Sequence, residues 1–370
     1  MHENEILCSM ALSRTLHFYP VIQHQLVKEI GSASAVYENR HHIKDLYPEI
    51  SDKLAEVLKG MDEHIKRAEE EWMFATQKGI ECICYHDENY PARLRECDDA
   101  PILLFYKGNA DMNRSRVINM IGTRHCTEYG KDLCRHFVHD LKLLCPDVLV
   151  VSGLAYGIDI HSHRAALSNG LDTIGVLAHG LDQIYPRTHR NTAIEMIGQG
   201  GLLTEFMSKT NADKVNFVRR NRIVAGMADA TIVIESADKG GALITAGIAS
   251  DYNRDVFAFP GRINDAYSQG CNQLIRDNKA ILIQNADDFM DAIGWVKKKE
   301  QQENIQIELF PDLCEEEQRI IEYLQQQERA HINNLSIAVN IPIHKISGFL
   351  FHLEMKGLVK LMSGGTYRLL

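Results

Sequence analysis

The sequence has no apolar run of about 18 residues, the length that a helix needs to cross a bilayer, so it predicts no membrane partner. Its start, MHENEILCSMALSRTL, lacks a basic region followed by a long apolar run, and we expect no signal peptide. The nine cysteines are scattered and include no C-x-x-C pair. This favours reduced core thiols in a cytoplasmic protein and argues against a metal site.

Basic side chains are fewer than acidic ones, 40 against 50, and the formal net charge is −10. This balance argues against a protein that binds nucleic acid over its whole surface. A local basic site remains possible because binding depends on local patches of charge and not on the net charge. Most of the acidity lies in residues 1–110, which hold 12 basic and 19 acidic side chains. Residues 111–290 hold 19 and 20, so any basic site is expected there.

A length of 370 residues suggests two or three domains. Residues 1–75 have apolar side chains at helical spacing and predict a small helical module, similar to SAM or helix-hairpin-helix modules. Whether this module contacts DNA stays open. Residues 76–110 contain short apolar runs and are interpreted as a connecting segment, and the polar residues 296–313 as a linker.

Residues 111–295 alternate short apolar runs with helical stretches. Most of the runs are followed by glycine, which is typical of strands buried on both faces of a parallel sheet. We therefore predict an α/β domain, an extended Rossmann-like, doubly wound parallel sheet. The seven runs are VINMIG (117–122), DVLVVSG (147–153), DTIGVLAHG (172–180), GLLTEF (201–206), ATIVIES (230–236), DVFAFPG (255–261) and AILIQ (280–284).

Residues 314–370 predict three helices followed by two strands around a Ser-Gly-Gly turn. This order is that of a winged-helix-like domain. Its third helix is apolar and carries few basic side chains. DNA docking through that helix is therefore retained beside the alternative of a protein-contact or autonomous stabilising module, which is slightly favoured.

Glycine-rich loops follow several predicted strands. Because the carboxyl ends of parallel strands share one edge, these loops should converge there, where backbone N–H groups and helix N-termini can hold phosphate. The candidates are Gly122, Thr123 and Arg124 after the first strand, Ser152, Gly153 and Gly157 after the second, and Gly240 and Gly241 after the fifth. The loops contain neither G-x-x-x-x-G-K-[ST] nor G-x-G-x-x-G, which argues against the common nucleotide pockets and predicts no cofactor.

The densest basic run extends from Lys214 to Arg222 and includes Phe217, Arg220 and Asn221. An aromatic ring beside arginines suits single-stranded nucleic acid, because the ring stacks on a base while the cations hold the backbone. The alternative is an amphipathic helix with a core phenylalanine and solvated arginines. Asp159, just inside a helix, is interpreted as an N-terminal dipole partner.

These motifs resemble, in order, those of the DprA/Smf family of DNA-processing proteins. IGTRHCTEYG (121–130) is similar to the family element G-[ST]-R-x-x-[ST]-x-Y-G, and VSGLAYGIDIHSH (151–163) to S-G-x-A-x-G-I-D-x-x-A-H. The resemblance is strong over residues 111–290 and looser towards both ends. The other matching segments are GLDQIYPRTHRN (180–191), FVRRNRIVAG (217–226), KGGALITA (239–246), VFAFPG (256–261) and GCNQLI (270–275).

The resemblance implies a non-catalytic protein that binds single-stranded DNA in a basic pocket and protects it. It also implies a homodimer that loads RecA recombinase onto incoming strands during natural transformation. Val218 stands where the family usually has proline. By position, the DNA pocket would be formed or supported by Arg124, Lys214, Phe217, Arg220, Asn221 and Arg222, with backbone donors from Ser152 and Gly153.

Two alternatives remain. One is a nucleoside-monophosphate phosphoribohydrolase of the lysine-decarboxylase-like Rossmann group, whose P-G-G-x-G-T-x-x-E motif carries a catalytic glutamate. Here Gly247 and Ile248 stand where that acid should be, which argues strongly against the enzyme. The other is an interaction hub whose terminal units bind proteins.

Overall fold

The computed structural model describes residues 2–297, 313–327, 329–356, 358–362 and 365–369. The chain forms two compact units, residues 1–298 and 299–370. Among the described residues, no helix combines the length and the apolar character needed to cross a membrane. All nine cysteines are free and seven of them are buried, as the sequence predicts for core thiols.

A nine-stranded sheet forms the centre of the first unit, in the order β1-β2-β6-β5-β4-β3-β7-β8-β9. The strands from β6 to β9 in this order pair in parallel, and β1 and β2 add an antiparallel edge. All seven strands predicted from the apolar runs are present. The strands are β1 (Glu81–Cys84), β2 (Leu103–Gly108), β3 (Val117–Ile121), β4 (Leu149–Ser152), β5 (Thr173–Val176), β6 (Gly200–Thr204), β7 (Ala230–Val233), β8 (Asp255–Ala258) and β9 (Ile281–Leu282).

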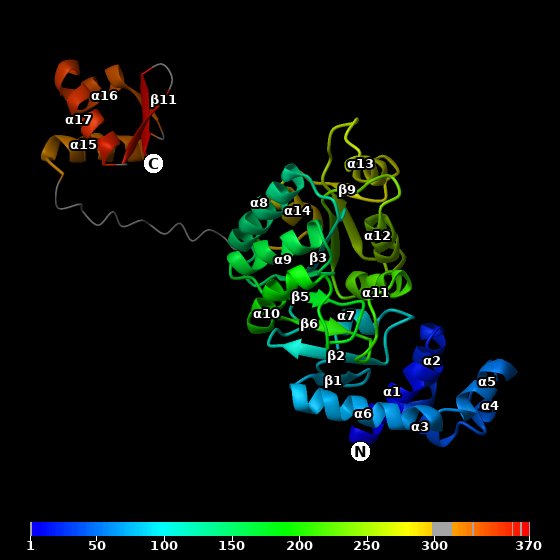
Figure 1. Ribbon diagram of the computed structural model, residues 1–370. Coiled ribbons are helices and arrows are strands. Elements are labelled where there is room, and N and C mark those ends of the chain that lie inside the picture. Colours follow the sequence, from blue (N-terminus) through cyan, green and yellow to red (C-terminus); the bar gives the residue numbers. More distant parts are fainter. Residues whose placement is uncertain (1, 298–312, 328, 357, 363–364, 370) are drawn as a thin grey trace. The chain divides into compact units, whose positions relative to one another are not determined.

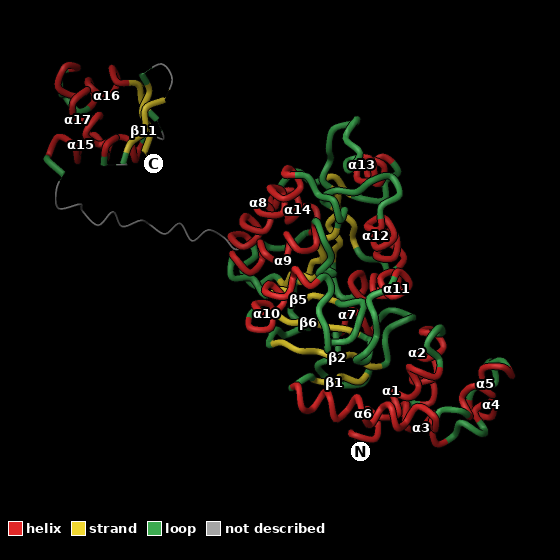
Figure 2. The backbone as a smooth tube through the Cα atoms, in the orientation of Figure 1, coloured by secondary structure: helices red, strands yellow, loops and turns green. Residues whose placement is uncertain are grey.

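Helices cover both faces of the parallel part (Figures 1 and 2). One face carries α8 (Glu128–Leu144), α9 (Ile158–Ser168), α10 (Arg190–Gly198) and α14 (Ala286–Ile293). The other carries α11 (Lys214–Gly226), α12 (Gly241–Asp251) and α13 (Gln269–Arg276). The central strands β3, β4 and β7 are buried at every position, which explains their continuous apolar sequences.

The N-terminal helices belong to the same unit. Helix α1 packs on α6 and on β1, so the N-terminal helices lie beside the antiparallel edge of the sheet. The carboxylate of Glu71 on α6 accepts hydrogen bonds from the backbone N–H and hydroxyl of Ser208, at 2.8 and 2.5 Å. The helices are α1 (His2–Thr15), α2 (Pro20–Ile30), α3 (Ala33–Glu38), α4 (Ile43–Leu46), α5 (Asp52–Lys59) and α6 (Asp62–Lys78), followed by the short α7 (Ala92–Arg95).

The second unit has its own apolar core, which includes Leu324, Leu335, Leu350 and Val359. Its helices and its final hairpin agree with the elements predicted from the sequence, and a short strand, β10, pairs with the hairpin. The elements are α15 (Glu315–Gln326), β10 (Ala330–His331), α16 (Ile332–Ala338), α17 (Ile343–Met355), β11 (Val359–Met362) and β12 (Thr366–Leu369).

Candidate nucleic-acid interface

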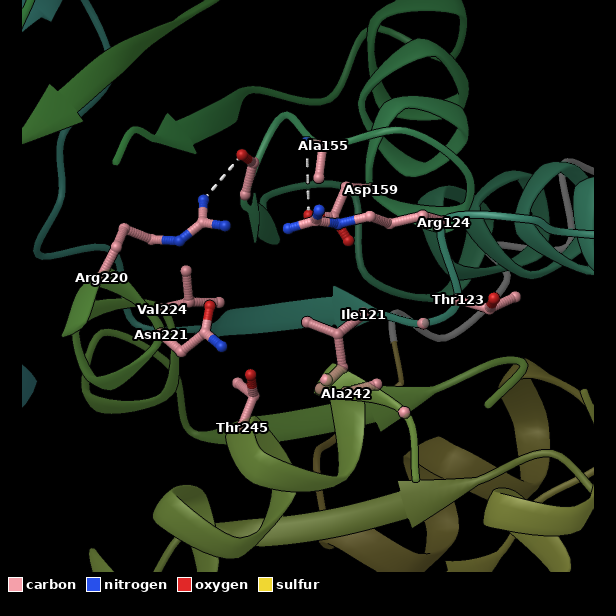
Figure 3. A pocket seen from close by; sticks show the side chains of 14 residues that line it. Ile121, Thr123, Arg124, Ala155, Asp159, Arg220, Asn221, Val224, Ala242 and Thr245 are labelled. Atoms are coloured by element: carbon pink, nitrogen blue, oxygen red, sulfur yellow. Dashed lines mark hydrogen bonds between the residues drawn. The ribbon is translucent and has the colours of Figure 1, made fainter. Parts of the chain in front are cut away.

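A cavity of about 220 Å³ opens where the strand order of the sheet reverses. The chain leaves β3 towards β4 on one side and returns to β7 on the other, so the loops after these strands separate and leave a crevice. Helices α11 and α12 complete the cavity. The lining residues are Ile121, Gly122, Thr123, Arg124, Gly153, Ala155, Asp159, Arg220, Asn221, Val224, Gly240, Gly241, Ala242 and Thr245 (Figure 3).

Eight of the thirteen predicted site residues line this cavity: Gly122, Thr123, Arg124, Gly153, Arg220, Asn221, Gly240 and Gly241. The other five lie outside the lining: Ser152, Gly157, Lys214, Phe217 and Arg222. The structure therefore brings together three loops and one helix that are far apart in the sequence.

Two of the predicted residues outside the lining hold the loops in place. The buried hydroxyl of Ser152 donates to the carbonyl oxygen of Met120, at 2.6 Å, and so links β4 to β3. Gly157 has a φ of +76°, a conformation that favours glycine, and a Cβ there would collide with the carbonyl oxygen of Thr123. This close approach lets the N–H of Ile158 donate to the same oxygen, at 3.2 Å.

Arg220 is a buried cation at the inner wall of the cavity. Its Nη1 donates to the carbonyl oxygen of Gly153, at 2.6 Å (Figure 3). The same Nη1 also donates to the carbonyl oxygen of Val176. Burial lowers the pKa of Arg220 to about 10, which still leaves the side chain charged at neutral pH. Both of these hydrogen bonds come from Nη1, whereas the buried Nε has no hydrogen-bond partner, and through Nη1 Arg220 holds the inner wall of the cavity.

Asp159 places a buried carboxylate in the same cavity, between Arg220 and Arg124. Burial raises the pKa of Asp159, and the two nearby guanidinium groups oppose the shift. The N–H of Ala155 donates to its Oδ2, at 3.4 Å. The sequence interpretation as a helix-terminal carboxylate is compatible with its place on α9 but did not predict a cavity-lining residue.

Arg124 connects the cavity to an aromatic surface. Its guanidinium carbon lies 4.7 Å from the ring centroid of Phe217, in cation–π geometry. The ring of Tyr185 also contacts the ring of Phe217, with 5.9 Å between the two centroids. An aromatic ring and a cation therefore lie together here, but the cation is Arg124, from another element, and not an arginine of the basic run that contains Phe217.

Lys214 is exposed at the first position of α11, whose N-cap is Asp213. A cation there adds to the partial positive charge of the helix N-terminus instead of neutralising it. This arrangement is unfavourable for the helix alone, but it increases the attraction for an anion beside Phe217.

The other arginines of the basic run point away from the cavity. Arg222 is buried and pairs with Glu205, and it also donates to the carbonyl oxygen of Asp99. The guanidinium of Arg219 contacts the ring of His17, at 3.1 Å, and lies over the ring of Phe206. One face of α11 thus lines the cavity, and the opposite face packs against the N-terminal part of the chain.

Sequence reasoning did not include among its site residues six lining residues that the fold supplies: Ile121, Ala155, Asp159, Val224, Ala242 and Thr245. It included Tyr185 only within the segment GLDQIYPRTHRN (180–191). Spacing offered a signal for Thr245, which lies four residues after Gly241 on α12 and so faces the same side. No local pattern distinguishes the cavity side of α9 or α11 from the core side.

The fold and cavity define a mixed α/β protein with a glycine-lined, cationic crevice at the carboxyl edge of a mostly parallel sheet. Residues 81–294 match the family model of DNA recombination-mediator protein A, and the chain belongs to this family. This confirms the resemblance to DprA/Smf proteins.

Relatives support the same assignment. The chain is 39% identical over 202 residues to the DNA processing protein DprA of Streptococcus pneumoniae, covering 54% of this chain and 70% of the relative. It is 32% identical over 320 residues to a putative DprA of Mycobacterium tuberculosis, covering 82% of this chain and 81% of the relative.

Two solved structures are similar. The X-ray structure of DprA from Streptococcus pneumoniae has a TM-score of 0.60 at 29% identity and covers 75% of this chain and 97% of its own. DprA from Helicobacter pylori, whose structure was solved in a study of its single-stranded DNA binding mode, has a TM-score of 0.52 at 28% identity. That match covers 58% of this chain and 95% of the other.

Proposed function

We propose that this protein is a cytoplasmic recombination mediator that binds single-stranded DNA, protects it and loads RecA recombinase during natural transformation. Family membership supports the mediator role. The relative from Helicobacter pylori, described by its single-stranded DNA binding mode, supports the ligand.

The contact between Arg124 and Phe217 carries the proposal. It places a cation and an aromatic ring side by side at the edge of a glycine-lined cavity. Gly240 and Gly241 start α12 at the opposite wall, where the helix N-terminus favours a phosphate. A single strand can present a phosphate to one part and a base to the other at the same time.

The size of the cavity favours a single strand over a duplex. A volume of about 220 Å³ admits a phosphate and part of a nucleotide but not a rigid double helix. The net charge of −10 adds a general repulsion that only local contacts overcome. We therefore expect a flexible strand to enter where a duplex does not.

Equilibrium binding of oligo-dT and of duplex DNA across a salt series tests this function. We expect preference for the single strand and a log K that falls with log salt. Arg124→Ala and Lys214→Ala should each reduce that slope by about one, and Phe217→Ala should weaken binding with little change in slope. Arg135→Ala, which removes a 63% exposed cation on α8, is the control. Unchanged binding in all three variants would refute the site.

We propose that the cavity binds and does not catalyse. Among the described residues that line it, Asp159 has the only carboxylate. The guanidinium groups of Arg220 and Arg124 lie near this carboxylate, so we assign it a structural role. Release of free base from a nucleoside monophosphate by the purified protein would instead favour the phosphoribohydrolase.

We further propose that the protein is a homodimer and that residues 314–370 form a winged-helix-like domain. Three helices and a hairpin on one apolar core support that domain. Light scattering coupled to size exclusion tests the dimer, and the rate of RecA filament formation on single strands, with and without the protein, tests loading.

A further inference from the structure

Tyr185 presents an exposed aromatic ring beside the proposed DNA site. It lies in the loop between β5 and the 3₁₀ turn Arg187–His189, and 47% of the residue is exposed. Its ring is tilted by 56° relative to that of Phe217, with 5.9 Å between the centroids. A large exposed aromatic in contact with a site aromatic offers a surface on which a further base can stack.

Phe217 is already engaged by protein groups. Arg124 lies over its ring at 4.7 Å, Tyr185 contacts it, and the residue is half-buried. A base that reaches this surface therefore meets Tyr185 as well as Phe217. Two adjacent rings can each take one base of a strand, because every base has an aromatic face.

The backbone of Tyr185 is held although its ring is free. Its N–H donates to Nε2 of the buried His179, at 3.2 Å. Nδ1 of His179 lies 2.9 Å from the carbonyl oxygen of Gly180, so Nδ1 carries the proton and Nε2 is free to accept. Burial lowers the pKa of His179, which keeps this neutral form at physiological pH.

The rest of the loop is tied to the segment that leads into α11. The side-chain amide of Gln183 donates to the carbonyl oxygen of Thr210, at 3.0 Å, and the N–H of Lys209 donates to Asp182, at 3.0 Å. The loop is therefore ordered before any ligand binds, and stacking on Tyr185 would cost little backbone entropy.

We propose that Tyr185 is a second base-stacking residue, so that Tyr185 and Phe217 together hold two successive bases of a single strand. This inference rests on the proposed function and adds a binding residue to it. The ligand is a flexible single-stranded nucleic acid of any sequence, since stacking does not read base edges.

Binding of oligo-dT to Tyr185→Ala and Tyr185→Phe tests the proposal. We expect Tyr185→Ala to bind about 10-fold more weakly, with an unchanged salt slope, because stacking is lost and no charge is removed. Tyr185→Phe should bind like the wild type because it keeps the ring. Leu143→Ala, which trims a 65% exposed apolar residue at the far end of α8, controls for loss of surface area.

A crosslinking experiment on the unaltered protein removes any dependence on folding of the variant. Irradiation with an oligonucleotide that carries 5-iododeoxyuridine should give a crosslinked peptide that contains Tyr185. Wild-type affinity in Tyr185→Ala, together with no crosslink at Tyr185, would overturn the inference. If Arg124→Ala loses binding in the same experiments, the proposed function still stands. Failure of the wild-type protein to bind oligo-dT would overturn the proposed function itself.

Discussion

Nη1 of Arg220 lies 2.6 Å from the carbonyl oxygen of Gly153, the residue that directly follows β4. This buried hydrogen bond ties α11 to the end of a central strand. Gly153 leaves the room that the guanidinium needs, since a Cβ at this position would collide with it. The wall of the cavity thus depends on one arginine and one glycine that are far apart in the sequence.

Replacing Arg220 should damage the fold as well as binding. Arg220→Ala leaves two buried carbonyls unpaired and takes a cation away from Asp159, so we expect a loss of roughly 3–5 kcal/mol in the free energy of unfolding. Arg220→Lys keeps the charge and should lose less. Urea unfolding measures both variants, and wild-type stability of Arg220→Ala would contradict this role.

Arg222 should contribute to stability and not to DNA affinity. Arg222→Met removes the nearer of the two guanidinium groups that pair with the half-buried Glu205, leaving Arg219 at 3.8 Å, and should cost roughly 3 kcal/mol, whereas Arg222→Met with Glu205→Leu should cost much less. Arg276→Ala, at an exposed ion pair, should change stability by at most about 1 kcal/mol. A large, selective loss of oligo-dT affinity in folded Arg222→Met would show instead that Arg222 contacts DNA.

Because His163 is buried, the free energy of unfolding should fall in mild acid. Burial lowers the pKa of His163 to about 3, whereas the unfolded chain keeps a value near 6.5. Between these values only the unfolded chain binds the proton, so this stability is present above about pH 6.5 and is lost as pH falls, by up to about 1.4 kcal/mol per pH unit.

His163→Gln isolates this contribution. The amide can replace the hydrogen bond that Nδ1 makes with Thr173, at 2.7 Å, but it does not titrate. Urea unfolding between pH 7.5 and pH 5 should therefore show a smaller loss in the variant, by about 2 kcal/mol at pH 5. Parallel pH profiles of the two proteins would disprove the assignment.

Glu71 should hold the N-terminal helices to the sheet. Glu71→Ala removes the acceptor of two bonds from Ser208 and of one from Arg67, at 2.7 Å, and should cost about 3 kcal/mol. Hydrogen exchange should rise in α6 while oligo-dT binding persists. Unchanged exchange in α6 would mean that other contacts hold this helix to the sheet. Glu56→Ala, at an exposed ion pair with Lys59, is the matched control.

The sequence by itself determined the parallel sheet and the glycine-rich edge. Apolar runs followed by glycine specify buried strands and the turns after them, because both properties are local. The same patterns located the helices and the hairpin of residues 314–370. The short runs in residues 76–110 did not reveal that β2 pairs with β6 and β1 with β2 as an antiparallel edge, because pairing depends on distant partners.

Only the tertiary structure decided what each charge of the basic run does. Arg219, Arg220 and Arg222 are close together in sequence, yet Arg220 faces the cavity wall, Arg222 pairs with Glu205 and Arg219 contacts His17. Rotation of about 100° per residue along a helix turns Arg220 away from Arg219 and Arg222, which share a face and both pair with Glu205, and the elements packed on each side supply the partners. The same holds for Arg124, which meets Phe217 only because β3 ends and α11 begins at the same edge of the sheet.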